Sequence, residues 1–232
     1  MVRYPVNGHS GNGYLSRPPA GTGPGVLVIQ EWWGLVDHIK QVADRFAAAG
    51  FVALAPDFYA GQTTQSPDTA AKLFMAVNID RAAADLRGAA NYLLSRPETA
   101  GPRLGVVGFC MGGQLALYAG MSYPDLVGAA VDFYGIHPNV PIDGAQLKVP
   151  VLGHFGTRDR SVPRDRVEAL VRAATDAGGR FEAHFYDADH AFFNDTRPTV
   201  HQPEAARLAW DRTVAFFRTN LGEPKDAPPP LR

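Results

Sequence analysis

A single cysteine, Cys110, lies between an apolar run and a helical pattern, in the sequence Gly108-Phe109-Cys110-Met111-Gly112. This G-x-Cys-x-G form is that of a nucleophile elbow, a sharp strand-to-helix turn that holds a nucleophile above a sheet. The turn brings the backbone close on both sides, so the flanking residues must be small. At a helix N-terminus, free N–H groups and the helix dipole favour a thiolate and a developing oxyanion. The spacing therefore predicts nucleophilic chemistry at Cys110.

A thiol needs a base before it can attack, and the base needs an acidic residue to orient it. In proteins that carry a nucleophile elbow on a parallel sheet, these partners follow in the chain order nucleophile, acid, base. Asp159 follows one predicted strand, and His190 follows the last predicted strand. Both can therefore meet Cys110 at the carboxyl ends of parallel strands. We predict a catalytic triad of Cys110, Asp159 and His190.

Other acidic residues near strand ends are the alternatives to Asp159. Asp132 also lies close to the end of a predicted strand, but two aromatic residues follow it and keep it inside that strand. Asp187 and Asp189 are too close in sequence to His190 to orient its ring from behind. These arguments favour Asp159 as the orienting acid.

A structural role for Cys110 and a catalytic role for another histidine are the remaining alternatives to this triad. A lone free cysteine is often a small buried hydrophobe, but the surrounding glycines and the ordered Asp and His favour catalysis. His154 lies in a predicted buried strand and is expected to be a core residue with satisfied hydrogen bonds. No HExxH or CxxC motif is present, so no metal site is expected. The other histidines are expected to be structural or at the surface: His9, His38, His137, His184 and His201.

Alternating strands and helices must position these residues. The apolar runs and turn signals predict strands at 2–6, 14–17, 26–30, 51–55, 104–109, 126–133, 149–155 and 181–186. Helical spacing predicts helices at 36–49, 68–77, 80–94, 111–121, 163–177 and 203–220, with Asp68 and Asp80 as N-caps of the second and third. The first two strands are expected to form a hairpin around a turn at 7–13. This alternation predicts an α/β fold with a mainly parallel central sheet and helices on both faces.

The bulk composition sets limits on size, partners and compartment. The chain has 232 residues, 46% hydrophobic and 19% charged, with a net charge of -1. We expect one domain over residues 1–222 and a disordered, Pro-rich tail at 223–232. The absence of a basic block argues against nucleic acid or a membrane surface as a partner. The single cysteine and the lack of a signal-peptide pattern predict a soluble, cytoplasmic protein.

Several of these motifs together resemble the dienelactone hydrolase family. The motifs are Gly108–Gly113, Gln30-Glu31-Trp32-Trp33-Gly34, the Gly-Thr-Arg-Asp that ends at Asp159, and Asp189-His190-Ala191-Phe192. The resemblance runs from about residue 10 to residue 220. It implies a single-domain α/β-hydrolase fold, a monomer and no cofactor. The implied activity is the opening of a lactone ring, with Cys110 as nucleophile, His190 as base and Asp159 as its orienter.

The resemblance also assigns roles around the nucleophile. Glu31 is implied to help take the thiol proton when substrate binds, and a carboxylate beside a thiol disfavours a standing, oxidisable thiolate. The oxyanion hole is implied to use the backbone N–H groups of Met111 and Trp32. Trp32 and Trp33 are expected either to pack in the core or to contact substrate.

The chain departs from the family where the substrate carboxylate is bound. The family uses two arginines, and the corresponding positions here hold Asn194 and the segment Ser66-Pro67-Asp68. Phe74 stands where the family has a tryptophan. Trp33, Phe74 and Asn194 are therefore the predicted substrate-binding residues. An asparagine cannot form the bidentate charged clamp of an arginine. Replacement cations have to come from elsewhere, and the candidates are Arg81, Arg158 and Arg197.

These observations predict a cysteine-dependent hydrolase of a small ester or lactone that works through an acyl-enzyme. Two alternatives remain within hydrolysis, a thioesterase and a general carboxylesterase. A third alternative is a non-catalytic binding protein or thiol redox sensor on the same fold.

Overall fold

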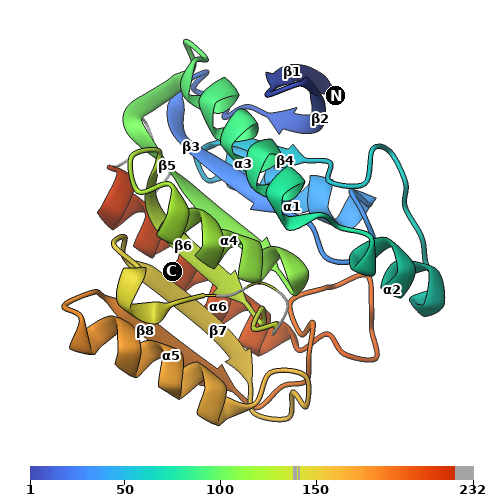
Figure 1. Cartoon of the computed structure of the whole chain (residues 1–232), viewed down its shortest axis with the longest axis vertical. Coiled ribbons are helices and arrows are strands. Elements are labelled where there is room, and N and C mark those ends of the chain that lie inside the picture. Colours follow the sequence, from blue (N-terminus) through green and yellow to red (C-terminus); the bar gives the residue numbers. More distant parts are fainter. Residues whose placement is uncertain (138–139, 141, 223–232) are drawn as a thin grey trace.

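The computed structural model describes residues 1–137, 140 and 142–222, so the predicted tail at 223–232 lies outside the described residues. One eight-stranded sheet, in the order β1-β2-β4-β3-β5-β6-β7-β8, forms the centre of the molecule (Figure 1). The β1–β2 and β2–β4 pairs are antiparallel and the remaining pairs are parallel. The strands are β1 (Val2–Val6), β2 (His9–Ser16), β3 (Gly23–Ile29), β4 (Val52–Pro56), β5 (Thr99–Phe109), β6 (Val127–Phe133), β7 (Val151–Gly156) and β8 (Phe181–Tyr186).

Helices cover both faces of the sheet, which confirms the predicted α/β fold. Helices α3, α4 and α5 lie on the face toward the viewer in Figure 1, and α1 and α6 lie behind the sheet. The short helix α2 stands at the side, beyond the carboxyl end of β4. The helices are α1 (Asp37–Ala48), α2 (Pro67–Met75), α3 (Ile79–Leu94), α4 (Met111–Ser122), α5 (Arg164–Asp176) and α6 (Pro203–Leu221), with a 3₁₀ turn at Gly144–Gln146.

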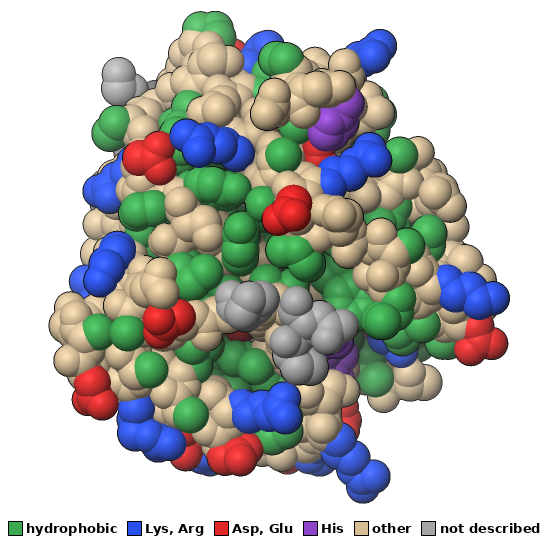
Figure 2. All heavy atoms as spheres, viewed as in Figure 1, with side chains coloured by type: hydrophobic (Ala, Val, Ile, Leu, Met, Phe, Trp, Pro, Cys, Tyr) green, Lys and Arg blue, Asp and Glu red, His purple; other side chains and the backbone are tan. Residues whose placement is uncertain are grey.

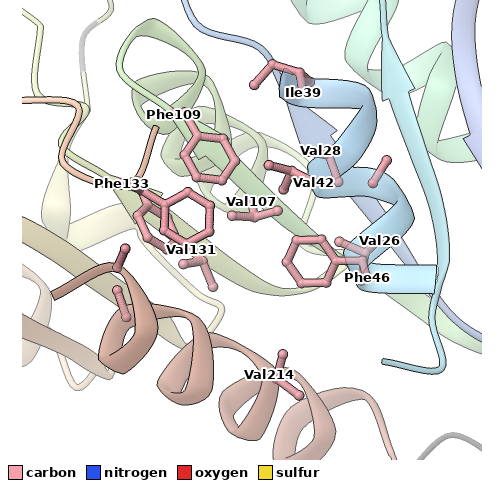
Figure 3. Packing of buried hydrophobic residues seen from close by; sticks show 14 of the residues in the cluster. Val26, Val28, Ile39, Val42, Phe46, Val107, Phe109, Val131, Phe133 and Val214 are labelled. Atoms are coloured by element: carbon pink, nitrogen blue, oxygen red, sulfur yellow. The ribbon is translucent and has the colours of Figure 1, made fainter. Parts of the chain in front are cut away.

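The core forms because the central strands are apolar on both sides. Figure 3 shows the layer behind the sheet, where strand residues such as Val107 and Val131 face Phe46 of α1 and Val214 of α6. The rings of Phe109 and Phe133 lie 4.8 Å apart at the carboxyl ends of β5 and β6. Burying side chains of this size on each face contributes about 1.5–3 kcal/mol per residue. This packing fixes the strand ends from which the candidate site is built.

Two local predictions were wrong in detail. The hairpin turn is only Asn7-Gly8, because Val6 pairs with His9 and β2 continues through the glycines that were assigned to the turn. A Cβ at one of them, Gly11, would lie closer to the Tyr4 ring than atoms can approach, so glycine there makes room for an aromatic cross-strand neighbour. The helix caps are Ser66 and Asn78 instead of Asp68 and Asp80.

The surface carries no strong charge asymmetry on the face that Figure 2 shows. Lys and Arg side chains are interspersed with Asp and Glu and form no large patch of one sign there. Among the helices of the described residues, none has both the length and the apolar character needed to cross a bilayer.

Candidate active site

The elbow at Cys110 has the strained geometry that the glycine spacing predicts. Cys110 joins β5 to α4 with φ +55° and ψ −117°, a conformation that non-glycine residues rarely adopt. A Cβ on Gly108 would overlap the carbonyl group of Gly112, and one on Gly112 would lie 2.5 Å from the carbonyl oxygens of Ile29 and Gln30. Only glycine fits at both positions, so the sequence around Cys110 follows from the close contact between the elbow and the end of β3.

Asp159 and His190 form the hydrogen-bonded pair that the sequence predicts. The Nδ1 atom of His190 lies 2.6 Å from Oδ2 of Asp159. His190 lies in the loop after β8, and Asp159 lies in the loop after β7. The other carboxylate oxygen of Asp159 accepts hydrogen bonds from the backbone N–H groups of Ser161 (2.8 Å) and Val162 (3.2 Å). These contacts fix the carboxylate. Because Nδ1 faces Asp159, the Nε2 atom of His190 is the one available to the nucleophile.

Cys110 lies within reach of this pair. Burial lowers the pKa of His190, but its hydrogen bonds to Asp159 and to Cys110 and the negative charges of both residues outweigh burial and raise the pKa to about 10. The imidazolium form is therefore favoured while the two partners carry negative charge. The structure thus brings together the three residues of the predicted triad, which come from the ends of β5, β7 and β8.

Glu31 is a buried carboxylate that is held by two neutral donors. It is 1% exposed and follows the end of β3. Oε2 accepts a hydrogen bond of 2.9 Å from Nδ2 of Asn194, and Oε1 accepts one of 3.4 Å from the hydroxyl of Tyr134. Neither donor carries a charge, so these contacts orient the carboxylate without neutralising it.

Asn194 therefore contacts Glu31, whereas the resemblance implied that it contacts the substrate. It was predicted to contact substrate, but it is 2% exposed and its amide is committed at both ends. Its Oδ1 accepts hydrogen bonds from the backbone N–H (3.1 Å) and the hydroxyl (2.7 Å) of Thr196, which directs Nδ2 toward Glu31. The predicted substrate contact is corrected to an internal one, because the loop after β8 folds inward and fills this space with its own side chain.

Tyr134 is a site residue that sequence reasoning missed. It follows β6, is 1% exposed, and has φ +46°. Its ring lies 5.0 Å from the ring of His190, centroid to centroid, and its hydroxyl reaches Glu31. Burial, first of all, raises its pKa well above the ordinary value, so the hydroxyl stays a donor. The sequence shows only an aromatic residue at the end of a strand. The strain that marks Tyr134 as unusual is visible in the backbone conformation alone.

The backbone N–H groups of Met111 and Trp32 stay the predicted oxyanion donors. Met111 is the first residue of α4, so its N–H has no acceptor within the helix. Trp32 directly follows Glu31 and lines a cleft beside His190. The side chain of Met111 contacts a nearly buried tyrosine. Tyr59 is 5% exposed, and its hydroxyl lies 3.5 Å from the Met111 sulfur.

The cleft beside His190 has a volume of about 790 Å³ and contains several arginines. Arg158 is paired with Asp187 (2.5 Å) and Asp189 (3.3 Å), so its charge is already compensated. Arg197 also lines the cleft, and its guanidinium carbon lies 5.4 Å from the centroid of the Trp33 ring. Within the part of the chain that the structure describes, Arg197 forms no ion pair.

The remaining predicted binding residues, Arg81, Phe74 and Trp33, are not among the residues that line this cleft. Arg81 lies on α3, 4.0 Å from Asp85, and does not line the cleft. Phe74, on α2, packs edge-on against His137 with ring centroids 4.7 Å apart and does not line the cleft either. Trp33 contacts Trp32 edge-on at 5.0 Å.

Asp132 and His154 lie where the sequence analysis expected. Asp132 is fully buried within β6, and its Oδ1 accepts a 2.8 Å hydrogen bond from the N–H of Gly135. His154 is fully buried, and its two ring nitrogens bond the hydroxyls of Tyr186 (2.9 Å) and Thr213 (3.0 Å). Both therefore belong to the core. In residues 1–137, 140 and 142–222, no three metal-ligating side chains are grouped in a way that could hold a metal ion.

Three of the remaining histidines pair with acidic residues, which fits the structural role expected for them. His9 pairs with Asp85 at 2.6 Å, and His184 pairs with Glu182 at 2.7 Å. His38, expected to be structural or at the surface, is buried and pairs with Asp195 at 3.2 Å.

Comparisons with known proteins agree with the fold described above. The model of the "Dienelactone hydrolase family" matches residues 12–221. The chain is 39% identical over 228 residues to "Protein usf" of Aquifex pyrophilus, covering 95% of this chain and 98% of that protein. It is 35% identical to the "Putative carboxymethylenebutenolidase" of Aquifex aeolicus, with the same coverage. A crystal structure of a "Putative Dienelactone Hydrolase" from Klebsiella pneumoniae aligns with a TM-score of 0.84 and 33% identity, covering 93% of this chain and 96% of that one.

Proposed function

Because the chain belongs to the dienelactone hydrolase family and is therefore a hydrolase of esters or lactones, we propose that it cleaves a small ester or lactone through an acyl-enzyme on Cys110. The observation that carries this proposal is the 2.6 Å contact between Asp159 and His190 beside a strained nucleophile elbow. An orienting acid, a base and a nucleophile in this order are what acyl transfer through a thiol requires.

The first half of the reaction forms the acyl-enzyme. Glu31 or His190 takes the thiol proton, and the sulfur of Cys110 attacks the carbonyl carbon. The negative charge that develops on the carbonyl oxygen is stabilised by the N–H groups of Met111 and Trp32 and by the N-terminus of α4. When the tetrahedral intermediate collapses, the C–O bond breaks and the imidazolium of His190 gives its proton to the leaving oxygen. In a lactone this oxygen stays attached to the acyl chain.

The second half releases the acid. Neutral His190 takes a proton from a water molecule as that water attacks the thioester carbon. The C–S bond then breaks, the thiolate of Cys110 takes back the proton that was removed in the first half, and the carboxylic acid departs. Asp159 keeps the ring of His190 in one orientation throughout, because its other oxygen is held by two backbone N–H groups.

We propose that the substrate carries a carboxylate that binds Arg197. Arg197 lines the cleft beside His190 and forms no ion pair with a described residue, so it can accept an anionic group without breaking an existing contact. The aromatic face of Trp33 supports its guanidinium. This supports a lactone with a carboxylate side group, such as a carboxymethylenebutenolide, more than a neutral ester.

Cys110→Ala tests the nucleophile. We expect the variant to fold and to lose turnover of dienelactone and p-nitrophenyl acetate, whereas Cys110→Ser should keep a small residual rate. Mass spectrometry of the wild type after brief exposure to substrate should find an acyl adduct on Cys110. Unchanged turnover in Cys110→Ala would contradict the proposal that Cys110 is the nucleophile. Oxidation of Cys110 by peroxide without any turnover would favour a redox sensor.

A panel of substrates separates the hydrolase alternatives. A lactone, a thioester and a neutral aryl ester should be compared by kcat/KM, and we expect the lactone with a carboxylate to be preferred. A thioester preference would favour a thioesterase. We also propose that the protein works as a monomer in the cytoplasm, because a reducing compartment keeps the thiol of Cys110 available. Size-exclusion chromatography with light scattering tests the monomer.

A further inference from the structure

A cavity between β8 and α6 is separate from the candidate active site. β8 is the last strand in the sheet order, and α6 lies behind the sheet (Figure 1). The cavity has a volume of about 380 Å³, a size typical of sites that bind small organic molecules. Its ionisable lining residues are Arg180, Glu182, His184 and Arg212. None of its lining residues belongs to the cleft beside His190, so it is a distinct space on the molecule.

A chain of buried hydrogen bonds holds Arg212 in place. The hydroxyl of Thr213 donates to the carbonyl of Ala209 at 2.8 Å, so its oxygen accepts the Nε2 hydrogen of His154 at 3.0 Å. Burial holds the pKa of His154 well below its ordinary value, so the ring is neutral and its Nδ1 accepts from the Tyr186 hydroxyl at 2.9 Å. The Tyr186 oxygen is then the acceptor for Nη1 of Arg212 at 2.9 Å. Every polar atom of this chain is used, and its outer end is the guanidinium that lines the cavity.

Both arginines of the cavity are held by neutral groups. Arg212 bonds the tyrosine hydroxyl just described, and Arg180 donates to Oδ1 of Asn220. The carboxylate that lines the cavity, Glu182, pairs with His184 at 2.7 Å and not with an arginine. Neither arginine forms an ion pair with a described residue. The two guanidinium groups are therefore free to bind an anion without breaking an existing ion pair.

Apolar side chains form much of the remaining lining. They are Val151 and Leu152 of β7 and Ala215 and Phe216 of α6. A small inorganic ion would leave this wall in contact with water, whereas a molecule with an apolar body would cover it and gain about 25 cal/mol per Å². The planar guanidinium groups suit the paired oxygens of a carboxylate or a phosphate. The lining therefore favours a ligand with an anionic head and an apolar body.

We propose that the cavity between β8 and α6 is a second binding site, for an organic anion with a carboxylate or phosphate head. The head binds Arg180 and Arg212, and the apolar body lies against Phe216. The hydrogen-bond chain through Tyr186 keeps Arg212 oriented before the ligand arrives, which lowers the cost of ordering its side chain on binding. The site uses no residue of the proposed reaction, so it stands or falls separately from catalysis at Cys110.

Isothermal titration calorimetry with phenyl phosphate and phenylacetate tests the site. The titrations use Arg197→Gln protein as the background, so that the cleft beside His190 does not bind the probes through Arg197. We expect one of the probes to bind with a Kd of about 1 mM or tighter. Adding Arg180→Gln or Arg212→Gln should raise this Kd roughly tenfold, because each removes a charged hydrogen bond. Arg207→Gln is the matched control on α6, because Arg207 pairs with Asp211 at 3.2 Å and does not line the cavity; we expect no change in Kd.

Arg212→Lys guards against an indirect effect on folding. Lysine keeps the charge and a donor for Tyr186 but loses the fork, so we expect a smaller rise in Kd than in Arg212→Gln and a thermal midpoint close to that of the wild type. In the wild-type background, Arg212→Gln should keep kcat/KM for p-nitrophenyl acetate, which separates this site from the proposed function. Absence of binding of both probes at about 10 mM, or Kd values that Arg180→Gln and Arg212→Gln leave unchanged, would overturn the proposal. Inorganic phosphate that binds as tightly as phenyl phosphate would contradict the role of the apolar wall.

Discussion

The amide of Asn194 donates an Nδ2 hydrogen to Oε2 of Glu31 at 2.9 Å, joining the loop after β8 to the end of β3. Both side chains are almost fully buried. The contact fixes a buried carboxylate with a neutral group. The resemblance implies an arginine at the position of Asn194, whereas the described hydrogen-bond donors to Glu31 here, Asn194 and Tyr134, are both neutral.

Replacing Asn194 should change how activity depends on pH. Asn194→Asp places two carboxyl groups at hydrogen-bond distance, and such a pair shares a proton because both cannot easily be ionised. Glu31 then accepts a proton less readily, so we expect kcat/KM at pH 7 to fall about 100-fold and to recover as the pH rises. Asn194→Ala should lose less and keep the wild-type profile shape. Identical pH–rate profiles for Asn194→Asp and the wild type would show that Glu31 does not act as a base.

The ion pair at His190 should make folding stability fall at alkaline pH. The pKa of His190 is raised to about 10 in the folded protein and is near 6.5 in the unfolded chain. Its contribution is therefore fully present below about pH 6.5 and is lost as the pH rises through about 10. Asp159→Asn removes the main partner, so the stability difference between wild type and variant should shrink from pH 6 to pH 10. Urea unfolding at both pH values measures it; a constant difference would contradict the assignment.

Arg197 should decide between anionic and neutral substrates. A hydrogen bond to a charged group contributes about 1.5–3 kcal/mol, so Arg197→Gln should raise KM for dienelactone roughly 10- to 100-fold. For neutral p-nitrophenyl acetate the change should stay below about threefold. Arg81→Gln is the control, because Arg81 does not line the cleft. Equal losses on both substrates would mean that Arg197 has a structural role.

The alternation of strands and helices along the chain and the closeness of Asp159 to His190 could be predicted from the sequence, because both depend on local patterns. Apolar runs mark buried strands, and the glycines around Cys110 mark a turn that excludes side chains. Asp159 and His190 were found because parallel strands bring their carboxyl ends to one edge of the sheet. Their 2.6 Å contact agrees with that argument.

The contacts between loops could not be predicted, because no local pattern encodes them. Asn194 and Glu31 are in contact although 163 residues separate them in the sequence. His38 pairs with Asp195, which lies in the loop after the last strand. Tyr134 was missed because its role depends on a positive φ. The caps at Ser66 and Asn78 were missed because each precedes a competing aspartate by two residues. In each case tertiary packing selects among side chains that the sequence leaves equivalent.

Asp132 should make the protein less stable as the pH rises toward 8. Its Oδ1 accepts the N–H of Gly135 at 2.8 Å, and among the described residues Oδ2 has no partner. Burial raises its pKa to about 8, against the smaller opposing effects of the Gly135 N–H and the His190 charge. The unfolded chain ionises Asp132 near pH 4, so between about pH 4 and pH 8 the folded form holds a proton that the unfolded form has released. Stability is therefore lost across this range.

Asp132→Asn keeps the acceptor for Gly135 and removes the ionisation. We expect the variant to equal the wild type near pH 4.5 and to be more stable at pH 8, as measured by the urea midpoint at both pH values. Asp125→Asn, an exposed position just before β6, is the matched control and should show no such pH-dependent gain. A variant that is less stable than the wild type at pH 8 would mean that ionised Asp132 stabilises the elbow. The negative charge beneath the first turn of α4 would then be part of the support of Cys110, because Asp132 Oδ1 occupies the space that a Cβ on Gly113 would need.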